Sequence, residues 1–573
     1  EYAAGWRLSC ASKVIGDVTV EVPDIASAYQ SRMKTADLST GKEVEIFRKL
    51  QEDLKNAGIH FRDLTFVQAW LEMDEPTLDD TMPDTERLTR AVQAVEETED
   101  VRLTYHVVRK LAKTLRDGAF KVMFAGVRKG DTVTVIDVAV KKDAPFYGCA
   151  IDIGTTTVTG VLLDLASGEI VAKASAGNGQ IRYGADVINR IIEQGKPGGV
   201  KRLQDAILKE TLRPMVGLMC KTAGIPADRI FRVCIASNTT MNHLLLGVDA
   251  DPVRMEPYIP TFFQWRGLSA KDLGFPANPD AEVLISPNIG SYVGGDITAG
   301  ALTSLIWDKD EFSLFIDLGT NGELVFGNRD FMMSCACSAG PAFEGGDISC
   351  GMRATDGAIE SCIIDQDSME PTFGIIGEAG QKPVGLCGSG IIDTIAELFR
   401  TGIINSKGLF VREGRRVVRD HHGTGRYILA FPEESATERE VALNEVDILN
   451  FIRAKGAIYS AIDTLLSAMD MDQSVIEGVY VAGGIGSGIN MKNAVRIGMF
   501  PNVPLELFHY IGNSSLAGAY TMALSDEAAQ KVEEVAKNMT YMELSTHPGY
   551  MDAFVAACFL PHTDASRFAD LED

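Results

Sequence analysis

The chain has 573 residues, of which 46% are hydrophobic, and a formal net charge of −25. Its length predicts about two to four domains, and its acidity argues against nucleic acid or an anionic membrane surface as a binding partner. No apolar stretch reaches the ~20 residues that span a bilayer, and the ten cysteines include no C-x-x-C pair, so we expect a cytoplasmic protein without a disulfide framework.

The first segment is similar to the end of a domain whose body is absent. Residues 5–23, GWRLSCASKVIGDVTVEVP, resemble the C-terminal end of a plant-type [2Fe-2S] ferredoxin domain, in which a lone fourth cysteine follows far behind a C-x4-C-x2-C loop. The resemblance makes Cys10 a remnant cluster ligand, but this sequence contains no such loop. We therefore expect a ferredoxin remnant over residues 1–23 that holds no iron–sulfur centre, followed by a polar linker over residues 24–40.

Residues 41–145 are predicted to form a small α+β domain. Apolar residues recur at helical spacing over 44–58 and 84–97, and the second helix begins with an Asp-Thr cap. Alternation of apolar and polar residues predicts strands over 120–126 and 132–140. No group of residues here is typical of catalysis, so the domain is predicted to serve in packing, docking or dimerisation.

The rest of the chain, residues 146–573, alternates between predicted strands and predicted helices. Two long helices are indicated over 201–223 and 447–469 by their apolar spacing. Such alternation predicts an α/β fold with a mixed sheet in each of two lobes.

One motif in this region occurs twice. Residues 151–164 read IDIGTTTVTGVLLD and residues 315–326 read FIDLGTNGELVF, each an apolar run ending in Asp, a Gly-Thr turn and a second apolar run. This pattern predicts a strand, a tight turn and a returning strand. Backbone N–H groups in such turns bind phosphate oxygens, so two hairpins that face each other would hold a nucleoside triphosphate from both sides. The residues predicted to bind phosphate are Gly154, Thr155, Thr156, Thr157, Gly319, Thr320 and Asn321.

A third segment completes the pattern. Residues 478–489, GVYVAGGIGSGI, read as a strand that enters a Gly-rich loop, and glycines let a backbone approach a planar base and ribose closely. The loop residues predicted to bind the nucleoside are Gly483, Gly484, Gly486 and Ser487. Together the three segments resemble the phosphate-1, phosphate-2 and adenosine motifs of the acetate and sugar kinase/Hsp70/actin (ASKHA) superfamily. That fold implies two connecting helices, and residues 294–305 and 512–523 fit because their Gly and Ala residues allow helices to cross closely.

Three carboxylates are candidates for the catalytic centre. Asp152 and Asp317 stand just before the two Gly-Thr turns, where a carboxylate can hold Mg²⁺ through water. Asp296, in the GGD at the head of a predicted helix, is a third carboxylate near the cleft. An alternative for Asp296 is a purely helical role, because the positive end of a helix favours a carboxylate.

Two further residues are candidates to line the cleft or orient water. Asn238 ends a predicted strand in CIASNTTMNHLLLG and is expected to line the cleft. Glu344, in GPAFEGG, lies among glycines and either orients water or serves only as a turn residue. His243 and the pair at 421–422 invite a metal interpretation, but no further ligand stands at ligand spacing, so they are predicted to be ordinary helix or loop residues.

The motifs taken together resemble those of one family, the reductive activators of corrinoid proteins. The resemblance rests on RLSC, the small second domain, and the segments IDIGTTT, SNTTM, FIDLGTNGEL, GPAFEGG, GLCGSGIID and VAGGIGSGI. It implies a [2Fe-2S] domain, a C-terminal ASKHA ATPase domain, a homodimer, ATP with Mg²⁺ as cofactors, and a corrinoid protein of a methyltransferase system as partner. It also implies that ATP hydrolysis drives uphill electron transfer from the [2Fe-2S] centre, so that Co(II) corrinoid returns to Co(I).

Three alternatives remain open at this point. A small-molecule kinase would use the same nucleotide motifs, with Asp296 as a candidate catalytic base. An ATPase activator of a dehydratase would bridge two subunits with a [4Fe-4S] cluster, for which the cysteines between 335 and 387 are candidates. An actin-like or Hsp70-like scaffold would use ATP only as a conformational switch.

Overall fold

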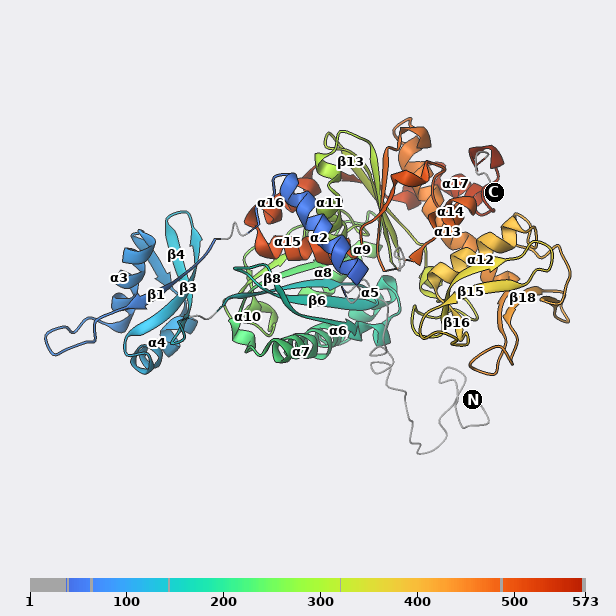
Figure 1. Cartoon of the computed structure of the whole chain (residues 1–573). Helices are drawn as coiled ribbons and strands as arrows, with labels where there is room; N and C mark the ends of the chain where they lie inside the picture. The colour runs from blue at the N-terminus through green and yellow to red at the C-terminus, as the bar shows by residue number, and fades with distance from the viewer. Residues whose placement is uncertain are drawn as a thin grey trace.

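The structure is a computed structural model that describes residues 38, 41–61, 65–142, 145–319, 321–484 and 488–568. It is elongated, with a small domain at one end and a two-lobed body beside it (Figure 1). The predicted ferredoxin remnant with Cys10, and nearly all of the predicted linker, lie outside the described residues. No helix in the described part is long and apolar enough to cross a bilayer.

The small domain is built on one four-stranded sheet in the order β1-β3-β4-β2. The predicted hairpin at 120–140 is present as the antiparallel pair β3 and β4. Sequence patterns did not reveal the helix α4, which is capped by Thr104 and buries Val107, Leu111 and Leu115 along one face. The elements are β1 (Phe66–Glu72), α3 (Asp84–Glu96), β2 (Asp100–Leu103), α4 (Tyr105–Asp117), β3 (Lys121–Lys129) and β4 (Thr132–Ala139).

The first predicted helix of this domain belongs instead to the two-lobed body. The helix α2 (Gly41–Asn56) packs its buried face into the core formed with α11, α15 and α16, and the Phe47 ring meets Tyr520 edge-on at 5.0 Å between ring centroids. The core of the four-stranded sheet contains none of the described residues of α2. The described part of α2 therefore packs on the two-lobed body and not on the four-stranded sheet, because amphipathic spacing identifies an apolar helix face but not the surface that covers it.

Each lobe of the body contains a six-stranded mixed sheet with the same central topology. In the first lobe, β7-β6-β5 form an antiparallel meander and β8 and β10 continue the sheet parallel to β5. In the second lobe, β13-β12-β11 repeat the meander and β20 and β21 continue it parallel to β11. The predicted α/β fold with a duplicated strand–turn–strand unit is confirmed.

The strands of the two sheets have the following bounds. In the first lobe they are β5 (Tyr147–Ile153), β6 (Thr157–Asp164), β7 (Ile170–Gly177), β8 (Ile230–Ser237), β9 (Leu268–Ser269) and β10 (Glu282–Ile285). In the second lobe they are β11 (Ser313–Leu318), β12 (Gly322–Gly327), β13 (Met332–Cys337), β20 (Gly478–Ala482), β21 (Phe508–Tyr510) and β22 (Met539–Tyr541).

Helices cover these sheets largely where the sequence predicts them. The predicted helix at 201–223 consists of two α-helices joined by a π-helical turn, Leu208–Leu212. Within that turn the Thr211 hydroxyl donates to the backbone oxygen of Ala206 at 2.8 Å. The helices of the body are α5 (Val187–Gln194), α6 (Gly199–Ile207), α7 (Arg213–Ala223), α8 (Thr239–Leu246), α9 (Asp251–Arg254), α10 (Ala270–Leu273), α11 (Gly295–Ser304), α12 (Gly388–Arg400), α13 (Glu445–Ser467), α14 (Met491–Arg496), α15 (Ser514–Leu524), α16 (Asp526–Lys537) and α17 (Tyr550–Ala557).

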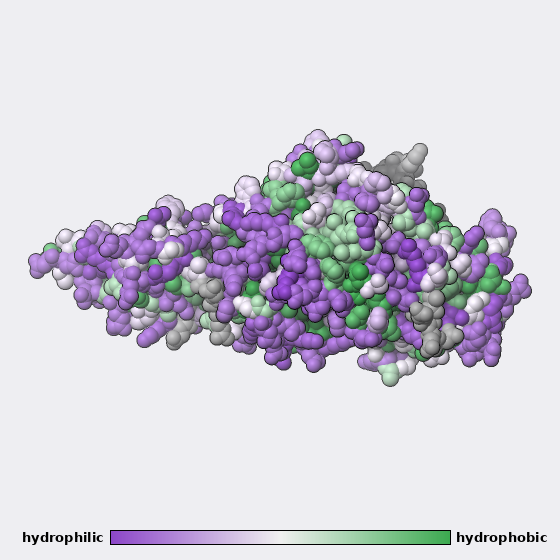
Figure 2. All heavy atoms as spheres, turned by 90° about the horizontal axis from the view of Figure 1, so that it is seen from above, coloured by the Kyte–Doolittle hydropathy of each residue, from purple (hydrophilic) through white to green (hydrophobic). Residues whose placement is uncertain are grey.

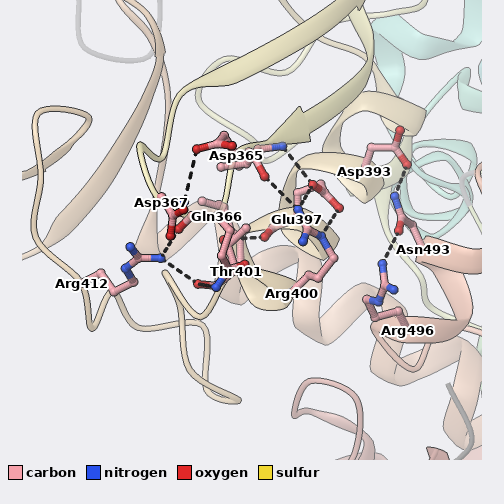
Figure 3. A network of polar contacts seen from close by, with 12 residues as sticks. Asp365, Gln366, Asp367, Asp393, Glu397, Arg400, Thr401, Arg412, Asn493 and Arg496 are labelled. Carbon is pink, nitrogen blue, oxygen red and sulfur yellow. Dashed lines mark hydrogen bonds and ion pairs between the residues drawn. The ribbon is translucent and has the colours of Figure 1, made fainter. Parts of the chain in front are cut away.

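Between β13 and β20 the second lobe carries an insertion of two three-stranded sheets, and α12 packs on the first of them. A polar network holds the C-terminal half of α12 to its neighbours (Figure 3). In it Glu397 accepts from the backbone of Ile364 at 2.9 Å and pairs with Arg400, while Asn493 donates to the buried Asp393 at 2.9 Å. The strands are β14 (Ala358–Ile364), β15 (Pro371–Ile375), β16 (Gly385–Leu386), β17 (Val417–Arg419), β18 (Gly425–Ala430) and β19 (Val441–Asn444).

The two lobes meet where α11 crosses α15. A Cβ atom on Gly518 would lie 2.4 Å from the backbone oxygen of Ala299, so the helices touch with almost nothing between their backbones. A Cβ atom on Gly300 would likewise lie 2.8 Å from the Ser514 hydroxyl. The Gly and Ala residues from which the two crossing helices were predicted are therefore needed here, because larger side chains would force the helices apart.

Charged contacts attach the small domain to the body. Asp137 of β4 is buried and pairs with Lys110 of α4 and, at 3.0 Å, with Arg229 of the first lobe. The Arg229 guanidinium also lies over the rings of Phe146 and Phe231. Seen from above, the small domain has a mostly hydrophilic surface, whereas hydrophobic residues gather over parts of the body (Figure 2).

Candidate active site

A cavity of about 310 Å³ lies between the two lobes, a size within the range of small-molecule sites. Residues from distant parts of the sequence converge on it, including both predicted turns and the Gly-rich loop. The predicted residues that line it are Asp152, Gly154, Thr155, Thr156, Thr157, Asn238, Asp296, Asp317, Gly319, Asn321, Gly483 and Gly484.

The first turn connects β5 to β6. Asp152, near the end of β5, accepts a hydrogen bond from the Asn513 amide at 2.9 Å. The Asn238 amide donates to the Thr155 hydroxyl at 3.2 Å, and the Asn238 side-chain oxygen caps α8 by accepting from the backbone of Met241. The two asparagines therefore join the first turn to the N-termini of α8 and α15.

The second turn connects β11 to β12 in the equivalent position. Asp317, near the end of β11, faces Glu323 across the antiparallel pair, and the turn is closed by a hydrogen bond from the Gly319 N–H to the Asn321 oxygen at 3.0 Å. Gly319 and Asn321 line the cavity. Thr320, also predicted to bind phosphate, lies outside the described residues.

The Gly-rich loop leaves β20 beside the second turn. Gly483 has φ +96°, and a Cβ atom there would lie 2.3 Å from the backbone oxygen of Leu318 and 3.2 Å from Asp317. A side chain at this position would therefore strain the backbone and displace the strand end that carries Asp317. Gly484 and Gly488 line the cavity, whereas Gly486 and Ser487 lie outside the described residues.

Three of the predicted carboxylates, each partly buried, line this cavity and repel one another. Burial raises the pKa of Asp152 to about 7, although its hydrogen bond from Asn513 opposes the shift. Burial, together with Asp296 and Asp152, raises the pKa of Asp317 to about 8. Burial also raises the pKa of Asp296 to about 6, while backbone N–H groups at the start of α11 lower it. A site that holds these three groups ionised needs a compensating cation.

Glu323 is a fourth carboxylate of the cavity that sequence reasoning missed. It lies on β12 opposite Asp317 and lines the same cavity. Burial, followed by the charges of Asp296 and Asp317, raises its pKa well above the usual range. In the sequence it looks like the polar member of an alternating strand, and only the cross-strand register with Asp317 identifies it.

Four helices of the body begin at this cavity. The lining residues Asn238, Asp296, Ser389 and Asn513 stand at or next to the N-termini of α8, α11, α12 and α15. The N-terminus of a helix carries unpaired N–H groups and a partial positive charge, which favour phosphate. The cavity thus combines carboxylates that suit a hydrated cation with N–H groups that suit phosphate oxygens.

Other candidates are placed away from this centre or remain undescribed. The backbone of Glu344 lies in a short 3-10 helix at Pro341–Glu344, but its side chain is outside the described part of the structure. His243 is fully buried, with its ring stacked on Phe262 and its Nε2 accepting from the backbone of Thr261 at 3.1 Å. Among the described residues no three His, Cys, Asp or Glu side chains are arranged to hold a metal ion directly.

The fold, with a cavity between its two lobes, defines the class of protein: a two-lobed domain of the ASKHA type. Residues 311–572 match the family model described as the C-terminal domain of RACo, the ASKHA domain. Residues 147–309 match the RACo middle region and residues 63–144 match the RACo linker region.

Individual relatives agree with these matches. The chain is 34% identical over 424 residues to the corrinoid activation enzyme RamQ of Eubacterium limosum, which covers 72% of this chain and 70% of that protein. It is 25% identical over 421 residues to the Co(II) methylated amine-specific corrinoid protein reductase of Methanosarcina barkeri, over 69% of this chain and 73% of that protein. The structure of a reductive activator for a corrinoid, iron–sulfur protein is similar with a TM-score of 0.78 and 39% identity, over 90% of this chain and 84% of that one.

The chain therefore belongs to the RACo family, the reductive activators of corrinoid proteins. It is a corrinoid activation enzyme with an ASKHA ATPase domain. In the family's nomenclature, the small α+β domain is the RACo linker region and the first lobe is the RACo middle region.

Proposed function

We propose that this enzyme hydrolyses ATP in the cavity between its lobes and uses the resulting movement of the lobes to drive Co(II) corrinoid to Co(I) on its partner protein. The observation that carries the proposal is the equivalent placement of two strand–turn–strand units, one from each lobe, on a single cavity. A ligand held by both lobes stabilises their closed arrangement, and its hydrolysis removes that stabilisation.

Magnesium fits the residues of this cavity as a hydrated ion. Since no three described His, Cys, Asp or Glu side chains are arranged to hold a metal ion directly, the ion would be held through water by Asp152 and Asp317 and directly by phosphate oxygens, as Mg²⁺ usually is with nucleotides. When bound, it would neutralise charge on the phosphates. Asp152 and Asp317 would orient its water shell, and the turns at Gly154 and Gly319 would hold the phosphate chain in line for attack by water.

An energy source is needed because the reduction is strongly unfavourable. For a one-electron couple, each ~60 mV of opposing potential reduces the equilibrium constant tenfold, and Co(I) lies far below the potential that a [2Fe-2S] centre usually supplies. The electron is expected to enter through the [2Fe-2S] domain that the family resemblance implies, whose candidate ligand Cys10 lies outside the described residues. Nucleotide-driven remodelling of the partner's cobalt environment offsets this gap.

The partner is proposed to be the corrinoid protein of a methylated-amine methyltransferase system. This assignment is supported by the relative from Methanosarcina barkeri, whose name gives that substrate. The homodimer that the family resemblance implies is also a proposal. Light scattering after gel filtration tests it directly.

The test follows cobalt absorbance under anoxic reducing conditions. A form of the enzyme that carries the [2Fe-2S] domain is mixed with a Co(II) methylated amine-specific corrinoid protein, with ATP, without nucleotide, or with a non-hydrolysable ATP analogue. We expect Co(I) to accumulate only with ATP. ATP hydrolysis without Co(I) would contradict the proposal and favour a small-molecule kinase or a dehydratase activator.

Binding of the Mg²⁺–nucleotide complex is predicted to weaken as the pH falls. The pKa values of about 7 for Asp152 and about 8 for Asp317 mean that both carboxyls gain protons between pH 9 and pH 6, and a protonated carboxyl does not hold the cation. Isothermal titration with a non-hydrolysable ATP analogue and Mg²⁺ should therefore show an affinity that falls about tenfold or more from pH 8.5 to pH 6. The same titration with adenosine is the control, since adenosine binding should not follow these pKa values.

A further inference from the structure

The carbonyl groups of the first phosphate turn are all occupied by buried donors. The Asn178 side-chain amide donates to the Gly154 oxygen at 2.9 Å, and the Asn178 backbone N–H donates to the Thr156 oxygen at 2.9 Å. Between them, the Arg190 guanidinium donates to the Thr155 oxygen at 2.5 Å. Three successive carbonyls are thus directed toward Asn178 and Arg190.

The two donors are themselves fixed in place. Arg190, on α5, has a fully buried side chain, and its Nε donates to the Gly184 oxygen at 2.9 Å while its Nη1 contacts the Met241 sulfur at 3.4 Å. The Asn178 side-chain oxygen accepts from the Gln180 backbone at 3.0 Å and caps the short helix that begins there. Neither donor can leave the turn without breaking these contacts.

The orientation of the carbonyls determines the orientation of the amides. Because a peptide unit is planar with its C=O and N–H groups opposed, carbonyls held by Asn178 and Arg190 leave the N–H groups of the same turn on the cavity side. N–H groups that point together from one turn form an anion site, and the guanidinium charge behind the turn favours negative charge in front of it.

We propose that Arg190 is a positioning residue which, with Asn178, holds the first turn in its phosphate-binding conformation before nucleotide arrives. This inference rests on the proposed binding of nucleotide in the cavity. Arg190 does not contact the nucleotide in this role. It acts through the Thr155 carbonyl, so its loss should weaken binding of the phosphate chain and leave binding of the nucleoside unchanged.

The test compares the wild-type enzyme with Arg190→Lys, Arg190→Gln and Asn178→Ala. The matched control is Arg232→Lys, because Arg232 is equally buried in the first lobe but pairs with Asp526 at 2.5 Å and does not line the cavity. For each protein, titration calorimetry gives the affinity for a non-hydrolysable ATP analogue with Mg²⁺ and for adenosine, and the melting temperature is measured without nucleotide.

We expect Arg190→Gln to bind the triphosphate at least tenfold more weakly, Arg190→Lys to lose less, and both to bind adenosine as the wild type does. Arg232→Lys should lower the melting temperature without loss of triphosphate affinity. Equal losses for adenosine and triphosphate, or an unchanged triphosphate affinity, would overturn the positioning role. If Arg190→Gln does not fold, Arg190→Lys and Asn178→Ala decide by the same criterion. Failure of the wild type itself to bind the triphosphate would instead refute the proposed function.

Discussion

Replacement of Asp317 by asparagine is expected to reduce ATP-driven Co(I) formation by about 10- to 100-fold and to raise the melting temperature of the nucleotide-free enzyme at pH 8. The first effect follows because an amide has no charge with which to hold the water shell of Mg²⁺. The second follows because burial, followed by the charges of Asp296 and Asp152, raises the pKa of Asp317 from 3.8 to about 8. A neutral side chain of the same shape removes that repulsion.

The stability gained by Asp317→Asn depends on pH. Between about pH 4 and pH 8 the folded state keeps a proton on Asp317 that the unfolded state has released, so the wild-type protein loses stability as the pH rises through this range. The advantage of Asp317→Asn should therefore be small at pH 4, grow up to about pH 8 and then remain constant. Differential scanning calorimetry at several pH values measures it.

Asp393→Asn is the matched control for this experiment. Asp393 is a buried carboxylate of the insertion in the second lobe, its pKa is raised by burial, and it lies outside the residues that line the cavity. It accepts from Asn493 through one oxygen, which an asparagine can also provide (Figure 3). The control should retain Co(I) formation. Full activity in Asp317→Asn, or an equal loss in both variants, would contradict a cation-holding role for Asp317.

Replacement of Gly518 by alanine is expected to destabilise the enzyme by about 1–3 kcal/mol or more. The added Cβ atom would lie 2.4 Å from the Ala299 oxygen and 2.7 Å from both the Ala299 carbonyl carbon and its Cβ atom. Since two of these three atoms are backbone, no side chain can move aside and the helices α11 and α15 must separate.

Gly217→Ala is the control, with an effect of the opposite sign. Gly217 lies in α7 with nothing within 4 Å of the added Cβ atom, so alanine should stabilise that helix by about 0.5–1 kcal/mol. Melting temperatures of the two variants, measured side by side, test the prediction. A Gly518→Ala protein as stable as the wild type would show that the helices do not cross at the distance described.

The convergence of both turns on one cavity could be predicted from the sequence because each turn lies within one short segment. Asp152 and Asp317 each stand two residues before a Gly of a tight turn, and strand–turn–strand geometry alone brings such residues to the edge of a sheet. The duplicated topology then places both turns on one cavity.

Two residues of the site, Asn513 and Glu323, were not predicted from the sequence. Asn513 bonds to Asp152 across 361 positions of sequence, and Glu323 is distinguished from an ordinary strand residue only by its partner across the sheet. The packing partner of α2 was not predicted for a related reason. Its apolar face could pack on any apolar surface, and the sequence pattern does not identify which surface lies next to it.

The direct contact between α11 and α15 limits how the lobes can move. Two helices that meet backbone to backbone at Gly518 and Ala299 have no layer of side chains between them at that point, so the contact opposes sliding and favours rotation of the lobes about it. Displacement in a rotation grows with distance from its axis. Under the proposed function, a rotation of a few degrees that hardly moves the helices themselves therefore becomes a larger shift at the outer edges of the lobes, where another protein can respond to it.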